Sequence, residues 1–130
     1  MIFGVGTDIA QVPRFERWVR NPKIIEKYFN QNEFFDGDLQ KSEKAACRHY
    51  AVRFAAKEAF AKALGTGFIG LTLRDFYVAK DKLGKPYFKF GEETKKILDS
   101  RLGNNYNIQL SMSHEKEYAV AFVVIEKGDN

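Results

Sequence analysis

Residues 41–64, KSEKAACRHYAVRFAAKEAFAKAL, decide the fold that this sequence can adopt. The stretch is rich in Ala, Lys and Glu and contains neither Gly nor Pro, the two residues that most disfavour a helix interior. Gly65 and Gly67 follow it, and a glycine just past the last turn is a common C-terminal signal of a helix. The pattern predicts one long helix from about residue 40 to residue 64.

Shorter elements are expected on either side of this helix. The alternating pattern IFGVGTDI predicts a strand over residues 2–9. Pro13 and Pro22 suit first helical positions, and Asn30 with Glu33 three residues later has the form of a capping box. The remaining expected elements are strands over 72–80, 87–90, 106–113 and 118–126, a turn at 83–86 and a helix over 92–102. The sum predicts an α+β fold, a mainly antiparallel sheet packed against one long helix.

The length and composition fit one domain spanning residues 1–130. Hydrophobic residues make up 45% of the chain, which is enough for a packed core. The single cysteine, Cys47, excludes an internal disulfide and fits a reducing compartment. No apolar run is long enough for a membrane helix and the first residues lack a signal-peptide pattern, so we expect a cytoplasmic protein with no membrane partner.

The net charge of +4 favours an anionic partner, which could be nucleic acid, a nucleotide or an acidic protein. A basic nucleic-acid-binding module is therefore one alternative. The excess of cations is the same in both halves of the chain, and no RNA-binding aromatic motif is present. We accordingly expect no nucleic acid partner.

Glu58 and Lys62 stand one turn apart on the long helix and share a face. A solvated ion pair is the ordinary interpretation of that spacing. The residues within roughly 60° of Glu58 on a helical wheel are Lys44, Cys47, Ala51, Ala55 and Gly65. Lys44 lies about 21 Å from Glu58 along the helix axis. The strip of small side chains predicts a path along which a long, multiply anionic ligand could lie.

Asp8 supplies a second carboxylate. Counting by twos, it shares a strand face with Ile2, Gly4 and Gly6, and glycines there permit close approach of another backbone or of phosphates. The alternative is that Asp8 caps the next helix. Two separated carboxylates and a lysine are a common way to hold Mg²⁺ on a phosphate substrate.

Other chemical motifs are incomplete. His114-Glu115-Lys116-Glu117-Tyr118 has Tyr118 where a zinc protease needs its second histidine, so no zinc site is expected. A nucleophilic pair of Cys47 with a histidine stays open, although a buried thiol is commoner in mid-helix. His114 ends an apolar strand pattern, and a lone histidine there more often has a structural role.

Several of these motifs together resemble one family, the holo-acyl-carrier-protein synthases of the 4′-phosphopantetheinyl transferase superfamily. Gly6-Thr7-Asp8-Ile9 followed by Arg14 resembles their first signature, and RFAAKEAFAKA at residues 53–63 resembles their second. Further stretches that look like family positions are Gly65-Thr66-Gly67, Gly84-Lys85-Pro86, Ser111-Met112-Ser113-His114 and Glu117-Tyr118-Ala119. The likeness runs from residue 2 to about residue 126 and implies the fold of that family.

The resemblance implies an enzyme, a 4′-phosphopantetheinyl transferase that supports fatty acid biosynthesis. Its expected reaction moves 4′-phosphopantetheine from coenzyme A to a serine of apo acyl carrier protein, with Mg²⁺ as cofactor and 3′,5′-ADP as product. The general base would be Glu58 or a metal-bound water. A nucleotide hydrolase using the same carboxylates is a further alternative. Family members of this length form homotrimers with sites at subunit interfaces.

The resemblance also assigns residues to roles. The implied Mg²⁺ ligands are Asp8 and Glu58, and the implied catalytic residues are Glu58, Lys62 and His114. The implied coenzyme A contacts are Lys44, Arg53, Lys62, Gly65 and His114, with His114 serving a neighbouring subunit. Ala45 follows Lys44 where some relatives have a second basic residue, so Arg48 or Arg53 would hold the adenosine 3′-phosphate instead.

A basic stripe is expected on the first helix. Arg14, Arg17 and Arg20 are spaced by three, so each steps only about 60° around the axis. Apolar residues between them, Phe15, Trp18 and Val19, would take the buried side. By the resemblance, Arg14 contacts the acidic carrier protein, while a solvated face is the alternative for the other two.

Overall fold

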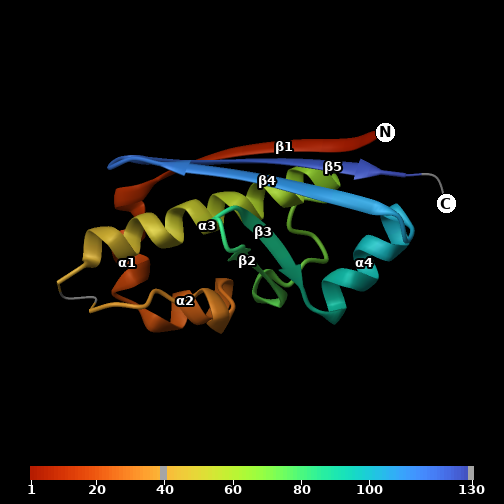
Figure 1. Ribbon diagram of the computed structural model, residues 1–130. Helices are drawn as coiled ribbons and strands as arrows, with labels where there is room; N and C mark the ends of the chain where they lie inside the picture. Colours follow the sequence, from red (N-terminus) through yellow and green to blue (C-terminus); the bar gives the residue numbers. More distant parts are fainter. Residues whose placement is uncertain (39–40, 129–130) are drawn as a thin grey trace.

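The computed structural model describes residues 1–38 and 41–128, which form three layers around one helix (Figure 1). The first layer is an antiparallel sheet in the order β1-β5-β4, made of β1 (Ile2–Gln11), β5 (Tyr118–Lys127) and β4 (Tyr106–His114). The second layer is the long helix α3 (Glu43–Leu64). The other elements lie on the far side of α3 from this sheet: α1 (Glu16–Val19), α2 (Pro22–Tyr28), β2 (Phe76–Lys80), β3 (Pro86–Phe90) and α4 (Glu92–Leu102).

The α+β prediction is confirmed, with differences in detail. The strands form two antiparallel sheets rather than one, because β2 pairs only with β3. Residues 73–75 form a 3₁₀ turn instead of the start of a strand. The helix expected from Pro13 is divided into a 3₁₀ turn, Val12–Phe15, and the short α1. The long helix begins at Glu43, and the part of the prediction that falls on residue 40 lies outside the described residues.

Two glycines bring the sheet against α3. A Cβ atom at Gly4 would lie only 2.0 Å from the carbonyl oxygen of Ala63, and one at Gly6 only 1.9 Å from that of Ala59. Any side chain there would push β1 off the helix. The close approach places the next inward-facing residue, Asp8, beside Glu58 and Lys62 of α3. Ile2 does not share this face, because a register shift between Ile2 and Gly4 leaves it exposed.

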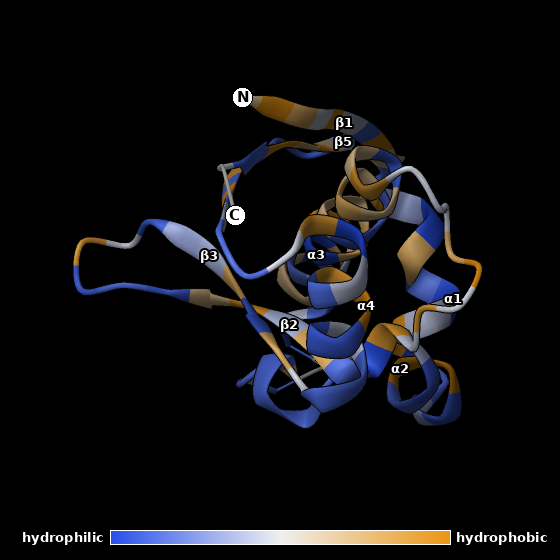
Figure 2. Cartoon of the chain, turned by 90° about the vertical axis from the view of Figure 1, so that its right-hand side faces the viewer, coloured by the Kyte–Doolittle hydropathy of each residue, from blue (hydrophilic) through white to orange (hydrophobic). Residues whose placement is uncertain are grey.

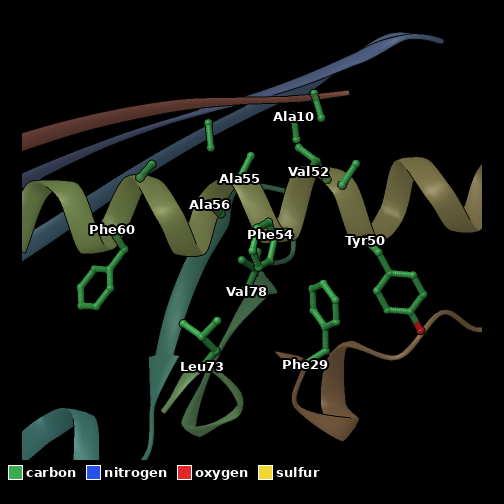
Figure 3. Packing of buried hydrophobic residues seen from close by; sticks show 14 of the residues in the cluster. Ala10, Phe29, Tyr50, Val52, Phe54, Ala55, Ala56, Phe60, Leu73 and Val78 are labelled. Atoms are coloured by element: carbon green, nitrogen blue, oxygen red, sulfur yellow. The ribbon is translucent and has the colours of Figure 1, made fainter. Parts of the chain in front are cut away.

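The two sides of α3 carry side chains of different size. Small residues such as Ala55 and Val52 face β1, where Ala10 packs, and this allows the close contact (Figure 3). Aromatic side chains, including Phe60, project from the other side into the space between α3, α2 and the β2–β3 hairpin (Figure 3). The second half of α3 is therefore enclosed on most sides: from Phe54 to Leu64, every residue except Glu58 and Lys62 is buried.

The outer face of the three-stranded sheet is apolar over β1 and β5, whereas β4 presents polar residues there, Asn107, Gln109, Ser111 and Ser113. Ile2, Val5 and Ile9 on β1 are 54–64% exposed, and Val120 and Phe122 on β5 are 40% and 46% exposed. Figure 2 shows the hydrophobic colouring along β1 on the outside of the molecule. None of the helices in the described part of the chain combines the length and apolar character that crossing a membrane demands.

Candidate active site

Three side chains of the predicted site meet at the open edge of β1. Lys62 Nζ donates hydrogen bonds to Asp8 Oδ1 and to the carbonyl oxygen of Thr7, both at 3.0 Å. Asp8 also lies close enough to Glu58 for the two carboxyl groups to interact. The strand supplies Asp8 and the helix supplies Glu58 and Lys62, so their convergence depends on the glycine-mediated contact of β1 with α3. The alternative for Asp8, an N-cap, is not observed, because no side chain caps the turn that follows β1.

Glu58 has the electrostatics of one member of a close carboxylate pair. Partial burial and the neighbouring Asp8 raise its pKa from 4.5 to about 7. The cations of Arg14 and Lys62 oppose this rise but do not cancel it. Near neutral pH the pair therefore accommodates a shared proton or an added cation more readily than two full negative charges.

The donor set fits a hard divalent cation. Asp8 and Glu58 offer carboxylate oxygens, and Mg²⁺ is usually held by one or two carboxylates with waters and substrate phosphates completing its shell. Within residues 1–38 and 41–128, no third His, Cys, Asp or Glu joins them in a group that could hold a metal. The chain would supply two ligands and leave most positions to water and phosphate oxygens.

Arg14 rests on an aromatic platform beside this site. Its guanidinium carbon lies 5.4 Å, 5.6 Å and 5.7 Å from the ring centroids of Phe15, Trp18 and Phe54. As expected, Phe15 and Trp18 take the buried side of the first helix, and Val19 does too. Arg20 is not a free member of the basic stripe, because its guanidinium binds both carboxylate oxygens of Glu43, at 2.6 Å and 3.1 Å.

The expected ligand path along α3 is wrong for the single chain. Cys47, Ala51 and Ala55 are at most 2% exposed because β1 and the Val12–Phe15 turn cover them. Small side chains on this face thus serve helix–sheet packing rather than an open groove. Burial raises the pKa of Cys47 to about 11, so its thiol is a poor nucleophile at neutral pH.

Lys44 lies at a surface pocket of about 330 Å³ at the other end of α3. Arg48 and Lys116 line the same pocket and give it two further cations, and Glu16 and Glu43 line it as well. Arg48 is therefore a basic side chain close to Lys44, in a chain that has Ala45 where some relatives have a second basic residue.

Arg53 faces a different direction. It is about 140° from Glu58 around the helix, and its Nη1 donates to the carbonyl oxygen of His49 at 3.2 Å. Its Nε is buried, with no hydrogen-bond partner in the part of the chain that the structure describes. His49 donates from Nε2 to the carbonyl oxygen of Glu33, and burial lowers the pKa of its imidazole to about 4.

His114 lies apart from its own carboxylates. His114 is the last residue of β4 and pairs with Ala119 of β5, which in turn pairs with Ala10 of β1. The strand β5 therefore lies between His114 and β1. Two strand spacings amount to about 9–10 Å. Of the other predicted coenzyme A contacts, Gly65 caps α3 near Lys62, with a φ of 87°. Within one chain, His114 and Lys44 both lie away from the Asp8–Glu58 pair.

Lys57 has a structural importance that the sequence pattern does not indicate. Its side chain is completely buried and forms an ion pair of 2.5 Å with the equally buried Glu33. The capping box predicted from Asn30 and Glu33 is present. The second role of Glu33, its buried ion pair with Lys57, has no signal in the local sequence. A lysine within a run of alanine and phenylalanine was the one available hint.

Solved structures share this architecture. A holo-[acyl-carrier-protein] synthase from Neisseria meningitidis is 38% identical, with a TM-score of 0.82 over 98% of this chain and 100% of that one. The synthase from Bacillus anthracis, described in complex with CoA (3′,5′-ADP), is 33% identical, with a TM-score of 0.76 over 98% and 99% of the two chains. The fold is therefore that of the phosphopantetheinyl transferase class of enzymes.

Sequence relatives lead to the same class over the whole chain. The holo-[acyl-carrier-protein] synthase of Treponema denticola is 45% identical across 97% of this chain and 99% of the relative. The profile of the 4′-phosphopantetheinyl transferase superfamily matches residues 4–123. The chain belongs to this superfamily, and the predicted family, fold and enzyme class are confirmed.

Proposed function

We propose that this protein transfers the 4′-phosphopantetheine group of coenzyme A to a serine of an apo acyl carrier protein and so supports fatty acid biosynthesis in the cytoplasm. Family membership over nearly the full chain supports the reaction, and the complex of the Bacillus anthracis relative supports coenzyme A as the donor. The observation that carries the proposal for this chain is the meeting of Asp8, Glu58 and Lys62 at one edge.

The reaction is a phosphoryl transfer. The serine oxygen forms a bond to the phosphorus that bears pantetheine, the bond from that phosphorus to the bridging oxygen breaks, and 3′,5′-ADP leaves. Mg²⁺, when bound, would neutralise pyrophosphate oxygens as charge develops on them. Asp8 and Glu58 would hold it, and Lys62 would turn its ammonium group toward the same oxygens.

Glu58 also suits the role of general base for the serine proton. Without a bound cation, its pKa of about 7 is near the best value for taking and returning a proton at neutral pH, whereas bound Mg²⁺ would favour the ionised carboxylate and lower that pKa. Its position beside Asp8 makes the same group a ligand, so the two roles compete for one carboxylate.

The adenosine 3′-phosphate would be held by Lys44 and Arg48. Both line one pocket, together with Lys116, and three cations there outnumber the two carboxylates. Arg53 is less suited in the single chain because its half-buried side chain lies on another face of α3, where its Nη1 donates to the carbonyl oxygen of His49.

The assembly is proposed to be a homotrimer with sites at the subunit interfaces. The apolar outer face of the sheet, formed by Ile2, Val5, Ile9, Val120 and Phe122, is a surface that another subunit would cover. His114 lies too far from its own Asp8 to serve the same site, which supports a contribution to a neighbour.

The deciding experiment is mass spectrometry of an apo acyl carrier protein incubated with this protein, coenzyme A and Mg²⁺. The mass of one phosphopantetheine should appear on one serine, and 3′,5′-ADP should appear in equal amount. The Asp8→Ala and Glu58→Ala variants are the matched controls, since each removes one carboxylate and should abolish transfer while the fold remains. Release of 3′,5′-ADP without any carrier protein would instead identify a hydrolase.

A further inference from the structure

Lys57 joins two stretches of the chain, residues 28–33 and 73–76, around one buried ammonium group. Its Nζ donates to the carbonyl oxygens of Tyr28, Leu73 and Phe76, at 3.1 Å, 2.7 Å and 2.9 Å, and pairs with Glu33. A buried charge is costly unless it is paired, and apolar residues of similar volume often stabilise a core equally well. The specific effect of this lysine is positional, because its hydrogen bonds fix where residues 28–33 and 73–76 lie against α3.

One of these contacts leads directly toward Arg14. Tyr28 stacks on Trp18, with ring centroids 5.1 Å apart and an angle of 25° between the rings. Trp18 in turn meets Phe54 edge-on at 5.0 Å. The Arg14 guanidinium lies over the Trp18 and Phe54 rings at 5.6 Å and 5.7 Å. A continuous set of contacts therefore runs from the Lys57 ammonium group to the Arg14 guanidinium.

We propose that Lys57 is a positioning residue that holds Arg14 in its docking orientation. It fixes Tyr28 and thereby the Trp18–Phe54 platform on which the guanidinium rests. This inference rests on the proposed function and on the role that the family resemblance gives to Arg14, which is contact with the carrier protein. An arginine already held over a platform loses less side-chain freedom when a partner binds, so preorganisation raises affinity.

The same geometry separates this role from the chemistry. Glu58 follows Lys57 in sequence but points about 100° away around the helix, toward Asp8. The contacts of Lys57 are to the segments on the opposite side of α3 from β1. Loosening them should affect the carrier protein more than coenzyme A.

The test combines Glu33→Gln with Lys57→Met, which together remove one negative and one positive charge and leave the net charge unchanged. Lys57→Met alone would leave the Glu33 carboxylate buried without its partner and is expected to fold poorly. Trp18 is the only tryptophan of the chain, so its emission and its quenching by acrylamide report on the platform directly. Leu98→Ala in α4 is the control, because it also destabilises the core but lies away from the platform.

The double variant should show a red-shifted, more readily quenched Trp18. Its KM for the carrier protein should rise about tenfold while its KM for coenzyme A stays within about twofold. The Leu98→Ala control should change neither Trp18 nor the ratio of the two KM values. An unchanged Trp18, or equal rises in both KM values, would overturn the proposal.

Arg14→Glu separates a failure of this inference from a failure of the proposed function. If Arg14→Glu raises the KM for the carrier protein and the double variant does not, Lys57 is not a positioning residue. If Arg14→Glu has no effect while Trp18 shifts in the double variant, the contact path from Lys57 stands and the docking role of Arg14 is wrong.

Discussion

Lys62 and Asp8 form an ion pair across the junction of α3 and β1, with 3.0 Å between Nζ and Oδ1. The Lys62 side chain is 54% exposed, whereas that of Asp8 is only 12% exposed. An ion pair with one end open to water contributes little to stability, typically about 0–1 kcal/mol. Under the proposed function, the pair places a cation beside the oxygens that the substrate would occupy.

Lys62→Met should therefore separate activity from stability. We expect kcat to fall about 100-fold, because a cation aimed at the charge of the transition state is lost. The midpoint of urea unfolding should change little. Steady-state kinetics and urea titration measure the two quantities. Lys96→Met, which removes an exposed lysine from α4, should leave both unchanged. Near-normal kcat in Lys62→Met would remove this residue from the catalytic set.

The titration of Glu58 gives a prediction with a definite sign. Without a divalent cation, its carboxyl ¹³C NMR signal should titrate near pH 7. Asp8→Asn should lower this pKa, although not to 4.5, because burial is the larger cause. Arg14→Gln should raise it, because the guanidinium favours the ionised carboxylate. Shifts of both variants in the same direction would contradict this account of the site.

The same pKa has a consequence for stability. A carboxyl whose pKa is raised on folding binds more protons in the folded than in the unfolded protein between about pH 4.5 and 7. Its contribution to the free energy of unfolding therefore falls as the pH rises through that window. Comparing urea unfolding of the wild type and Glu58→Gln across the window isolates this contribution, and the variant should lose less stability toward neutral pH.

Gly6→Ala tests how the site is assembled. Its Cβ would lie 1.9 Å from the carbonyl oxygen of Ala59, so β1 must move away from α3. We expect a loss of about 1–3 kcal/mol of stability and loss of transfer activity even in the folded fraction, because Asp8 moves with the strand. Gly67→Ala is the control, since its Cβ would meet nothing within 4 Å and only its φ of 58° is strained. Full activity of folded Gly6→Ala would show that the site tolerates a displaced strand.

The elements that local patterns specify were predictable from the sequence. The helix Glu92–Leu102 and the C-terminal end of α3 at Gly65 were placed correctly because capping and breaking residues are local signals. The meeting of Asp8 with Glu58 was foreseen only through the glycine pattern and the family resemblance. Fifty residues separate the two, and no local signal sets that contact.

The errors share a physical cause. The small residues Ala51 and Ala55 predicted an open strip, but a small side chain equally permits another element to pack closely, and β1 does so. The Lys57–Glu33 pair was missed because periodicity treats every lysine as exposed. Whether a polar residue is buried depends on what the rest of the chain places around it, which a single helix pattern does not contain.

Subunit mixing tests the proposed trimer. Light scattering should give three times the 15.0 kDa of one chain. Glu58→Ala and His114→Ala are each expected to be inactive alone. Because His114 would serve a neighbour, trimers that mix the two variants contain some intact sites and should recover part of the activity. A control mixture of Glu58→Ala with Asp8→Ala should recover none, since both residues lie on the same side of the interface. No recovery after verified exchange would show that His114 acts within its own chain or has no role.

Arg14→Glu tests the docking surface apart from the chemistry. Carrier proteins of this kind are expected to be acidic, and attraction between opposite charges acts mainly on association and weakens with salt. Reversing the charge should raise the KM for the carrier protein about tenfold or more and flatten its dependence on salt, with the KM for coenzyme A nearly unchanged.

The pKa of Glu58 should also rise in Arg14→Glu, so kinetics must be compared at the pH optimum of each variant. Lys96→Glu makes the same charge change on α4 and should leave the carrier KM nearly unaffected. If Arg14→Glu weakened coenzyme A binding and spared the carrier protein, the guanidinium on its aromatic platform would belong to the nucleotide site, and the carrier would have to approach from another face.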